Sequence, residues 1–201
     1  MNKLIILFSI SIIIIISCYV PEMIIDSKEY RKYRDAITHL DIGDNFYYIV
    51  SKRGIIIRTK DDFLYFRQSS YTLDRKYLNV LENIKVLLAE NKNVKIVVEG
   101  HSDFSGGEGA IFDNVILSKK RSEVVIKKLI DIGVDKSKLI SRYYSDYMPY
   151  YTNNSYDYNR SIRNRRVEFV FIGDDKYWEN YKNATEEVFS KVLELEKLIN
   201  N

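Results

Sequence analysis

Residues 97–121 read VVEGHSDFSGGEGAIFDNVILSKKR, and the pattern changes within them from strand to helix. The first part continues an apolar run, VKIVVEG at 94–100, which is typical of a buried strand. A loop with three glycines follows, and then a segment with a basic helix start. Loops after buried strands often carry binding residues. The stretch therefore raises the question of what Asp103, the loop and Arg121 would hold.

Short strands and amphipathic helices alternate around this stretch. Apolar residues at helical spacing predict helices over 75–91 and 115–132, with Asp74 capping the first and Gly133 ending the second. We expect the polar segment 152–164 to form a loop with a short helix. Strands are expected at FYYIV, RGIIIRT, FLYF, VKIVVEG, SKLISRYYS and RVEFVFI. This order predicts a two-layer α/β sandwich, that is, an α+β fold.

Residues 175–201 are expected to form a long amphipathic helix after the domain. Its apolar positions alternate in steps of three and four, with Thr185 interrupting them. They are Trp178, Tyr181, Val188, Val192, Leu195 and Ile199. The pattern fits a helix docked on the domain, or a short coiled-coil seam that binds a protein partner or a second copy. The polar break favours docking.

Composition excludes several classes of function. The formal net charge of +3 is too small to indicate a nucleic-acid binder. The two histidines lie far apart in sequence, and no HExxH, CxxC or P-loop motif occurs. We therefore expect no metal, no cofactor and no nucleic acid, and neither metal hydrolysis nor P-loop chemistry.

The N-terminus has the pattern of an export signal. Lys3 precedes an apolar run that is shorter than the ~20 residues of a spanning helix. The run ends in IISC, which resembles a bacterial lipobox, and Cys18 is the only cysteine in the chain. We interpret 1–17 as a lipoprotein signal peptide and 18–45 as a tether, with Cys18 carrying the lipid. The alternative is an uncleaved membrane anchor in which Cys18 is incidental.

Three ordered motifs resemble those of the OmpA-like peptidoglycan-binding domain. They are GHSD at 100–103, NVILSKKRS at 114–122 and NRRVE at 164–168. The resemblance covers roughly residues 54–172 and implies a β-α-β-α-β-(α)-β order, so we assign 46–174 to this domain. It also implies non-covalent binding to the diamino acid in the stem peptide of peptidoglycan.

The resemblance assigns roles to particular residues. Asp103 takes the position that meets the ligand's ammonium, and Arg121 takes the one that clamps its carboxylate. The remaining matched positions are Asn114, Arg165 and Ser102. A zwitterion needs one anionic and one cationic partner, and the planar fork of arginine fits a carboxylate. Ser118 would cap the helix or lend a hydroxyl.

Each residue also has a purely structural interpretation. Asp103 would then close its loop by accepting backbone N–H bonds. A lone His101 beside a glycine is more often packed than a ligand. Arg165 and Arg166 would form a solvated basic face, and strand alternation lets only one of them face the site.

The chain departs from the family pattern at three places. The loop from Asp103 to Asn114 is longer by about three residues, as judged from the motif spacing. Arg67 stands where the family commonly has an acidic residue. Tyr143, Tyr144 and Ser145 replace glycines. These changes border the expected site and leave open which diamino acid is held.

Together these patterns predict a lipid-anchored protein that tethers the outer membrane to the cell wall, with its domain facing the periplasm. One alternative is a flagellar-stator-like wall anchor, which needs a true spanning helix. Another is a cell-wall hydrolase that uses Glu99, Asp103 and Glu108 as paired carboxylates. The flexible loop between these carboxylates argues against catalysis.

Overall fold

The computed structural model describes residues 46–51, 53–59, 66–104, 110–150, 162–173 and 175–200. The expected signal peptide and tether lie outside these residues, as does the FLYF strand apart from Phe66. Within these residues, three helices and five strands form the framework, with two short 3₁₀ turns, η1 (Lys136–Lys138) and η2 (Ile162–Asn164). In chain order the main elements are β1 (Phe46–Ser51), β2 (Gly54–Thr59), α3 (Tyr77–Glu90), β3 (Lys95–Gly100), α4 (Ala110–Asp131), β4 (Leu139–Tyr143), β5 (Val167–Ile172) and α6 (Asp175–Asn200).

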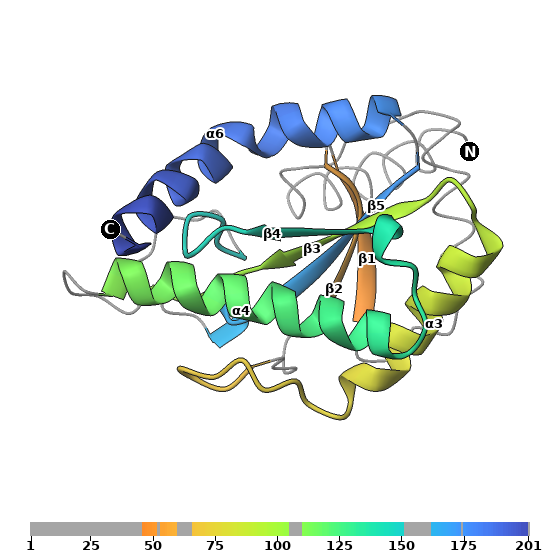
Figure 1. Ribbon diagram of the computed structural model, residues 1–201, viewed down its shortest axis with the longest axis horizontal. Helices are drawn as coiled ribbons and strands as arrows, with labels where there is room; N and C mark the ends of the chain where they lie inside the picture. The colour runs from red at the N-terminus through yellow and green to blue at the C-terminus, as the bar shows by residue number, and fades with distance from the viewer. Residues whose placement is uncertain are drawn as a thin grey trace, which may run out of the picture.

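The strands form one sheet in the order β1-β2-β5-β3-β4. Among the described strands, the β3–β4 pair alone is parallel, and the other neighbours are antiparallel. Helix α4 connects the parallel pair, as a parallel crossover requires. Helices α3 and α4 lie on one side of the sheet and α6 lies on the other (Figure 1). The α+β sandwich expected from the sequence is therefore confirmed, with α6 as an additional cover.

Both faces of the central strands are buried. Ile96, Val98 and Phe169 face α3 and α4 in the larger core cluster. Val97 and Val170 point the other way and pack against α6. Every side chain of β5 is consequently buried, although its sequence alternates. A helix on each face gives a strand no solvent side.

The helix starts differ from the sequence prediction. Asp74 lies ahead of α3, where its Oδ1 accepts the Lys76 N–H at 3.0 Å, and the N-cap position itself has no side-chain cap. This Asx turn satisfies a backbone donor just before the helix. Helix α4 begins at Ala110 rather than 115, so it includes part of the loop that looked long in the sequence. Gly133 ends it with a φ of +102°, as predicted.

Helix α6 docks on its own domain. Its buried residues are spaced by three or four and face the sheet and α4: Tyr177, Tyr181, Thr185, Phe189 and Val192. Thr185, which looked like an interruption, is buried and donates its hydroxyl proton to the Tyr181 carbonyl at 2.8 Å. The docked interpretation is thus confirmed, because the apolar side that a coiled coil needs is already covered. Among the described residues, no helix is long and apolar enough to cross a membrane.

Gly100 allows α4 to approach β3 closely. A Cβ built on Gly100 would lie 1.9 Å from the Ser118 carbonyl oxygen and 3.1 Å from the Ser122 nitrogen. Both atoms belong to the backbone of α4, which cannot move without repacking the helix. The glycine of the GHSD motif is therefore required by the distance between helix and strand.

Gly100→Ala should lower the free energy of unfolding by about 3 kcal/mol, because the added methyl overpacks a rigid contact. Urea unfolding at neutral pH measures the change. Gly133→Ala is a matched control, since open space surrounds its Cβ and only the strain of its positive φ remains. A Gly100→Ala protein as stable as the unmodified one would contradict this account.

Candidate functional site

Asp103 and Arg165 form an ion pair at the end of the sheet. The Arg165 Nη1 lies 2.9 Å from the Asp103 Oδ2, and both side chains keep some exposure, 11% and 17%. Strands β3 and β5 are antiparallel and pair Gly100 with Val167. Residues that follow β3 therefore meet residues that precede β5. This register brings together two motifs that are 62 residues apart in the chain.

Arg166 points to the other side, as strand alternation predicts for neighbouring residues. Its Nε donates to the Glu168 Oε1 at 2.8 Å, and its side chain is buried. Only Arg165 of the two arginines therefore contacts Asp103. The interpretation of both as a solvated basic face is wrong, because each is engaged in an ion pair.

Arg121 is fully buried beneath this pair. It lies about three turns into α4, deeper than a helix start at residue 115 would place it. Its guanidinium donates to three backbone carbonyls: His101 at 2.9 Å, Ser70 at 3.0 Å and Arg67 at 3.4 Å. Burial lowers the pKa of Arg121 to about 10, and the Asp103 carboxylate opposes this effect. The group therefore stays charged at neutral pH.

These bonds make Arg121 a junction between three segments. It joins α4 to the end of β3 and to the segment 66–76, which passes beside α4 in Figure 1. The Phe66 ring packs against the guanidinium, with 5.2 Å between the Arg121 Cζ and the ring centroid. Arg67, which replaces an expected acidic residue, contributes its carbonyl here while its side chain is exposed. Arg121 and Asp103 interact electrostatically, but the direct partner of Asp103 is Arg165.

Two other residues that the sequence singled out, Asn114 and Ser118, lie on α4. Asn114 is buried and shares a face of α4 with Arg121, seven residues later. Ser118 lies within the helix rather than at its start, so it caps nothing. Its hydroxyl instead donates to the Val115 carbonyl and accepts the Ser145 N–H at 3.1 Å.

Two polar groups near Asp103 have no hydrogen-bond partner among the residues that the structure describes. They are the Ser102 hydroxyl, on a side chain that is almost fully buried, and the Arg165 Nε. Buried polar groups are normally paired, so orphans beside a partly exposed ion pair indicate where a polar ligand would bind. The same site retains an anion and a cation that solvent can reach.

A second cluster of charges lies under α6, on the opposite face of the sheet. The Arg53 Nη1 is 2.6 Å from the Glu99 Oε2, and the Arg53 Nη2 is 3.5 Å from the Glu168 Oε2. Tyr181 donates its hydroxyl proton to the Glu99 Oε1 at 2.8 Å. Burial alone would raise the pKa of Glu99, but the adjacent Arg53 lowers it below its ordinary value.

His101 belongs to this buried cluster and not to the candidate site. Its Nε2 lies 3.8 Å from Glu99 and 3.9 Å from Glu168, and within the described part of the chain neither ring nitrogen has a hydrogen-bond partner. Burial and the nearby Arg166 lower its pKa to about 4. The histidine is therefore neutral at pH 7, in line with a structural role.

The ligand atoms of Glu99, His101 and Glu168 lie within 4.8 Å of one another, a spacing that a metal ion would fit. The two carboxylates are already balanced by Arg53 and Arg166, however. A divalent ion would leave two net positive charges buried, which is costly. The cluster is better explained as an internal ion network. Glu99 is also inaccessible to substrate, and Glu108 lies outside the described residues, so this geometry does not support paired catalytic carboxylates.

Stability should fall as the pH is lowered from about 6.5 to 4. Unfolded histidine titrates near 6.5 and the folded His101 near 4, so between these values the unfolded state binds one more proton. A difference of about 2.5 between the two pKa values corresponds to about 3 kcal/mol. Urea unfolding at pH 7 and pH 4.5 measures the loss. We expect His101→Gln to flatten the dependence, and an unchanged slope in that variant would contradict the assignment.

Sequence reasoning missed the ion network as a unit. Glu99 and His101 share the face of Val97, and Glu168 lies in an apolar strand, so both carboxylates were placed in positions that a sheet normally buries. Charges at such positions require partners. That requirement is a signal in the sequence, but the identities of Arg53 and Tyr181 depend on how β2 and α6 pack.

The OmpA family model matches residues 65–165, which is half of the chain and includes the GHSD and NVILSKKRS motifs. The chain belongs to the OmpA family. The residues that match the family model end before β5 and α6, so the structure extends the OmpA-like domain beyond them.

Similar proteins support the same assignment. The peptidoglycan-associated lipoprotein of Buchnera aphidicola is 26% identical over 144 residues, which cover 72% of this chain and 77% of that protein. A MotB-like protein from Desulfovibrio vulgaris is 25% identical with a TM-score of 0.56, covering 72% of this chain and 89% of that one. The periplasmic domain of Helicobacter pylori MotB, at 24% identity and a TM-score of 0.53, covers 73% and 91% and shares the fold.

Proposed function

We propose that this OmpA-family protein binds the stem peptide of peptidoglycan non-covalently, through the diamino acid of that peptide. The observation that carries the proposal is the Asp103–Arg165 pair, which offers opposite charges 2.9 Å apart at a partly exposed sheet end. Membership of the family and the similarity to a peptidoglycan-associated lipoprotein support it.

The geometry supports the following roles. The ligand's ammonium binds Asp103 and displaces the Arg165 guanidinium, which then turns to the ligand's carboxylate. Arg121 contributes its positive charge from beneath the ion pair. It does not donate to the ligand, because its donors are bonded to the His101 and Ser70 carbonyls. Ser102 and Asn114 complete the polar surroundings. A zwitterion thus replaces one internal ion pair with two, at little change in net charge.

Binding without hydrolysis fits these residues better than catalysis. Paired-carboxylate hydrolysis needs two acidic groups flanking the same bond, and Asp103 is instead paired with an arginine. Retention of the protein on purified sacculi tests binding, and turbidity of the same suspension tests hydrolysis. We expect retention with constant turbidity. Protein that stays in the supernatant would refute the proposal, and falling turbidity would favour the hydrolase.

We further propose that the chain is a lipoprotein of the outer membrane that tethers this membrane to the wall. The lipobox-like sequence before Cys18 supports the anchor, and the roughly 27 residues after it reach about 90 Å when extended. Multiple acyl chains give stable anchoring, with about 0.8 kcal/mol per buried CH₂. The domain would then face the periplasm.

Cys18→Ala should release the protein from membranes or leave an unprocessed precursor, because the lipid acceptor is lost. Fractionation and intact-mass measurement distinguish these results from normal processing. Ser17→Ala, which keeps a small residue before Cys18, is the matched control and should stay anchored. A processed Cys18→Ala protein that remains in the membrane would contradict the anchor.

A further inference from the structure

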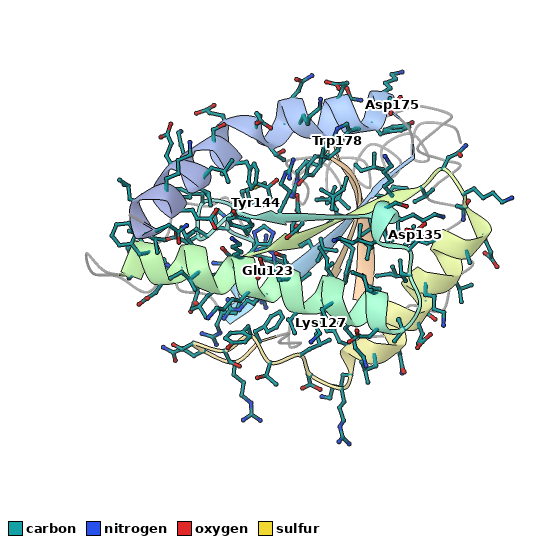
Figure 2. All side chains as sticks on the ribbon, viewed as in Figure 1. Glu123, Lys127, Asp135, Tyr144, Asp175 and Trp178 are labelled. Atoms are coloured by element: carbon teal, nitrogen blue, oxygen red, sulfur yellow. The ribbon has the colours of Figure 1, made fainter. Side chains whose placement is uncertain are left out.

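Two of the residues that depart from the family pattern at the end of β4, Tyr143 and Tyr144, contact α6. Tyr143 and Tyr144 stand where the family has glycines, and both rings pack edge-on against Phe189, at centroid distances of 5.6 and 6.0 Å. The Tyr144 and Tyr181 hydroxyls lie 2.6 Å apart. Figure 2 shows Tyr144 between α4 and α6. The large side chains therefore replace glycines where an additional helix provides a surface to pack on.

Backbone hydrogen bonds connect Tyr144 and the residue after it to the candidate site. The Tyr144 N–H donates to the Gly100 carbonyl at 3.0 Å, and the Ser145 carbonyl accepts the Ser102 N–H at 2.8 Å. These two bonds continue the pairing of β3 and β4 beyond their ends, up to the residue before Asp103. The position of the backbone at Asp103 thus depends on the turn at 144–145.

This turn has a strained conformation that its neighbours hold in place. Ser145 has a backbone φ of +51°, which residues other than glycine rarely adopt. Its N–H is held by the Ser118 hydroxyl of α4, and its own side chain is bonded to Asp146. Such a conformation persists only when the surroundings determine it. Tyr144, fixed by Tyr181 and Phe189, is the link between these surroundings and α6.

We propose that α6 is a positioning element of the binding site, with Tyr181 and Phe189 as its positioning residues. They hold Tyr144, and the turn that Tyr144 begins holds Ser102 and Asp103 in register with Arg165. The inference rests on the proposed function for its ligand, but the mechanical link concerns this chain alone. The domain without α6 would keep its sheet and lose the order of its binding end.

Two readouts on the full-length protein in detergent micelles test the link. Hydrogen exchange at Ser102 reports the bond to Ser145, and binding of a diaminopimelate-containing stem tripeptide reports the site. Both Tyr181→Phe and Phe189→Leu keep most of the packing volume. The first removes the hydroxyl contact to Tyr144 together with the bond to Glu99, and the second removes the aromatic edge contact to Tyr144 alone of these. Leu129→Ala, in the core on the opposite face of the sheet, is a control that lowers global stability without touching this link.

We expect both α6 variants to speed exchange at Ser102 about tenfold and to weaken peptide binding by a similar factor, with the control near the unmodified protein. Unchanged exchange and affinity in folded α6 variants would overturn the inference. So would an equal effect of Leu129→Ala, since general loss of stability would then explain the result. If the unmodified protein fails to bind the peptide, the proposed function fails, and exchange at Ser102 still decides whether α6 positions this backbone.

Discussion

Asp103→Ala is expected to weaken binding to purified sacculi about a hundredfold. The carboxylate supplies the charge-assisted hydrogen bond to the ligand's ammonium, and a bond of this kind contributes about 1.5–3 kcal/mol. Its loss also leaves Arg165 without its 2.9 Å partner and increases the positive charge around Arg121. Both changes disfavour an ammonium group. A sedimentation assay with increasing amounts of sacculi measures the apparent affinity.

The fold should survive this substitution, because Asp103 and Arg165 remain partly exposed. Asp131→Ala removes the same charge at the last residue of α4, and this variant should bind sacculi normally. Arg165→Ala should weaken binding less than Asp103→Ala, since Arg121 still provides positive charge nearby. Equal retention of Asp103→Ala and the unmodified protein, at matched folded fractions, would remove Asp103 from the site.

Arg53→Met should reduce the free energy of unfolding by about 3–5 kcal/mol, the usual cost of leaving a buried charge without its partner. Arg53 lies between Glu99 and Glu168, and all three side chains are buried. Methionine fills similar space but carries no charge. Two adjacent carboxylates would then share the remaining positive charge of Arg166, and protonation of one of them should follow.

Urea unfolding at pH 7 measures the Arg53→Met effect. Lys191→Met breaks an exposed pair with Glu187 of the same N–O type and should change stability by less than about 1 kcal/mol. Adding Glu99→Gln to Arg53→Met should recover part of the loss, because it removes one unpaired charge. An Arg53→Met protein with an unchanged unfolding midpoint would show that the network contributes nothing to stability.

The local patterns were sufficient for most elements of this fold. Helical spacing located α3 and α4, and apolar runs located β3 and β5, because each depends on neighbours within one segment. The boundaries were less secure. Helix α4 starts five residues earlier than expected, since the residues before Asn114, AIFD, directly follow a glycine-rich stretch and are too few to show helical periodicity. Asp74 was correctly placed near a helix start but forms a turn ahead of it.

The candidate site was only partly predictable. The motifs identified Asp103, Arg121 and Arg165, but the expected two-part clamp of Asp103 and Arg121 is not the observed ion pair. Asp103 contacts Arg165, and Arg121 is occupied by backbone carbonyls below it. A motif specifies which residue types occur and in what order. It does not specify which of two arginines reaches a carboxylate, because that depends on strand register and helix length.

The sequence by itself determined the family motifs, the order of strands and helices, and the amphipathic character of the C-terminal helix. Only the tertiary structure decided that Arg165 pairs with Asp103 and that Tyr181 reaches Glu99, across 62 and 82 residues of chain. It also placed α6 over the second face of the sheet. Periodicity records how a segment distributes its own side chains, whereas these contacts depend on how distant segments pack, which no local pattern contains.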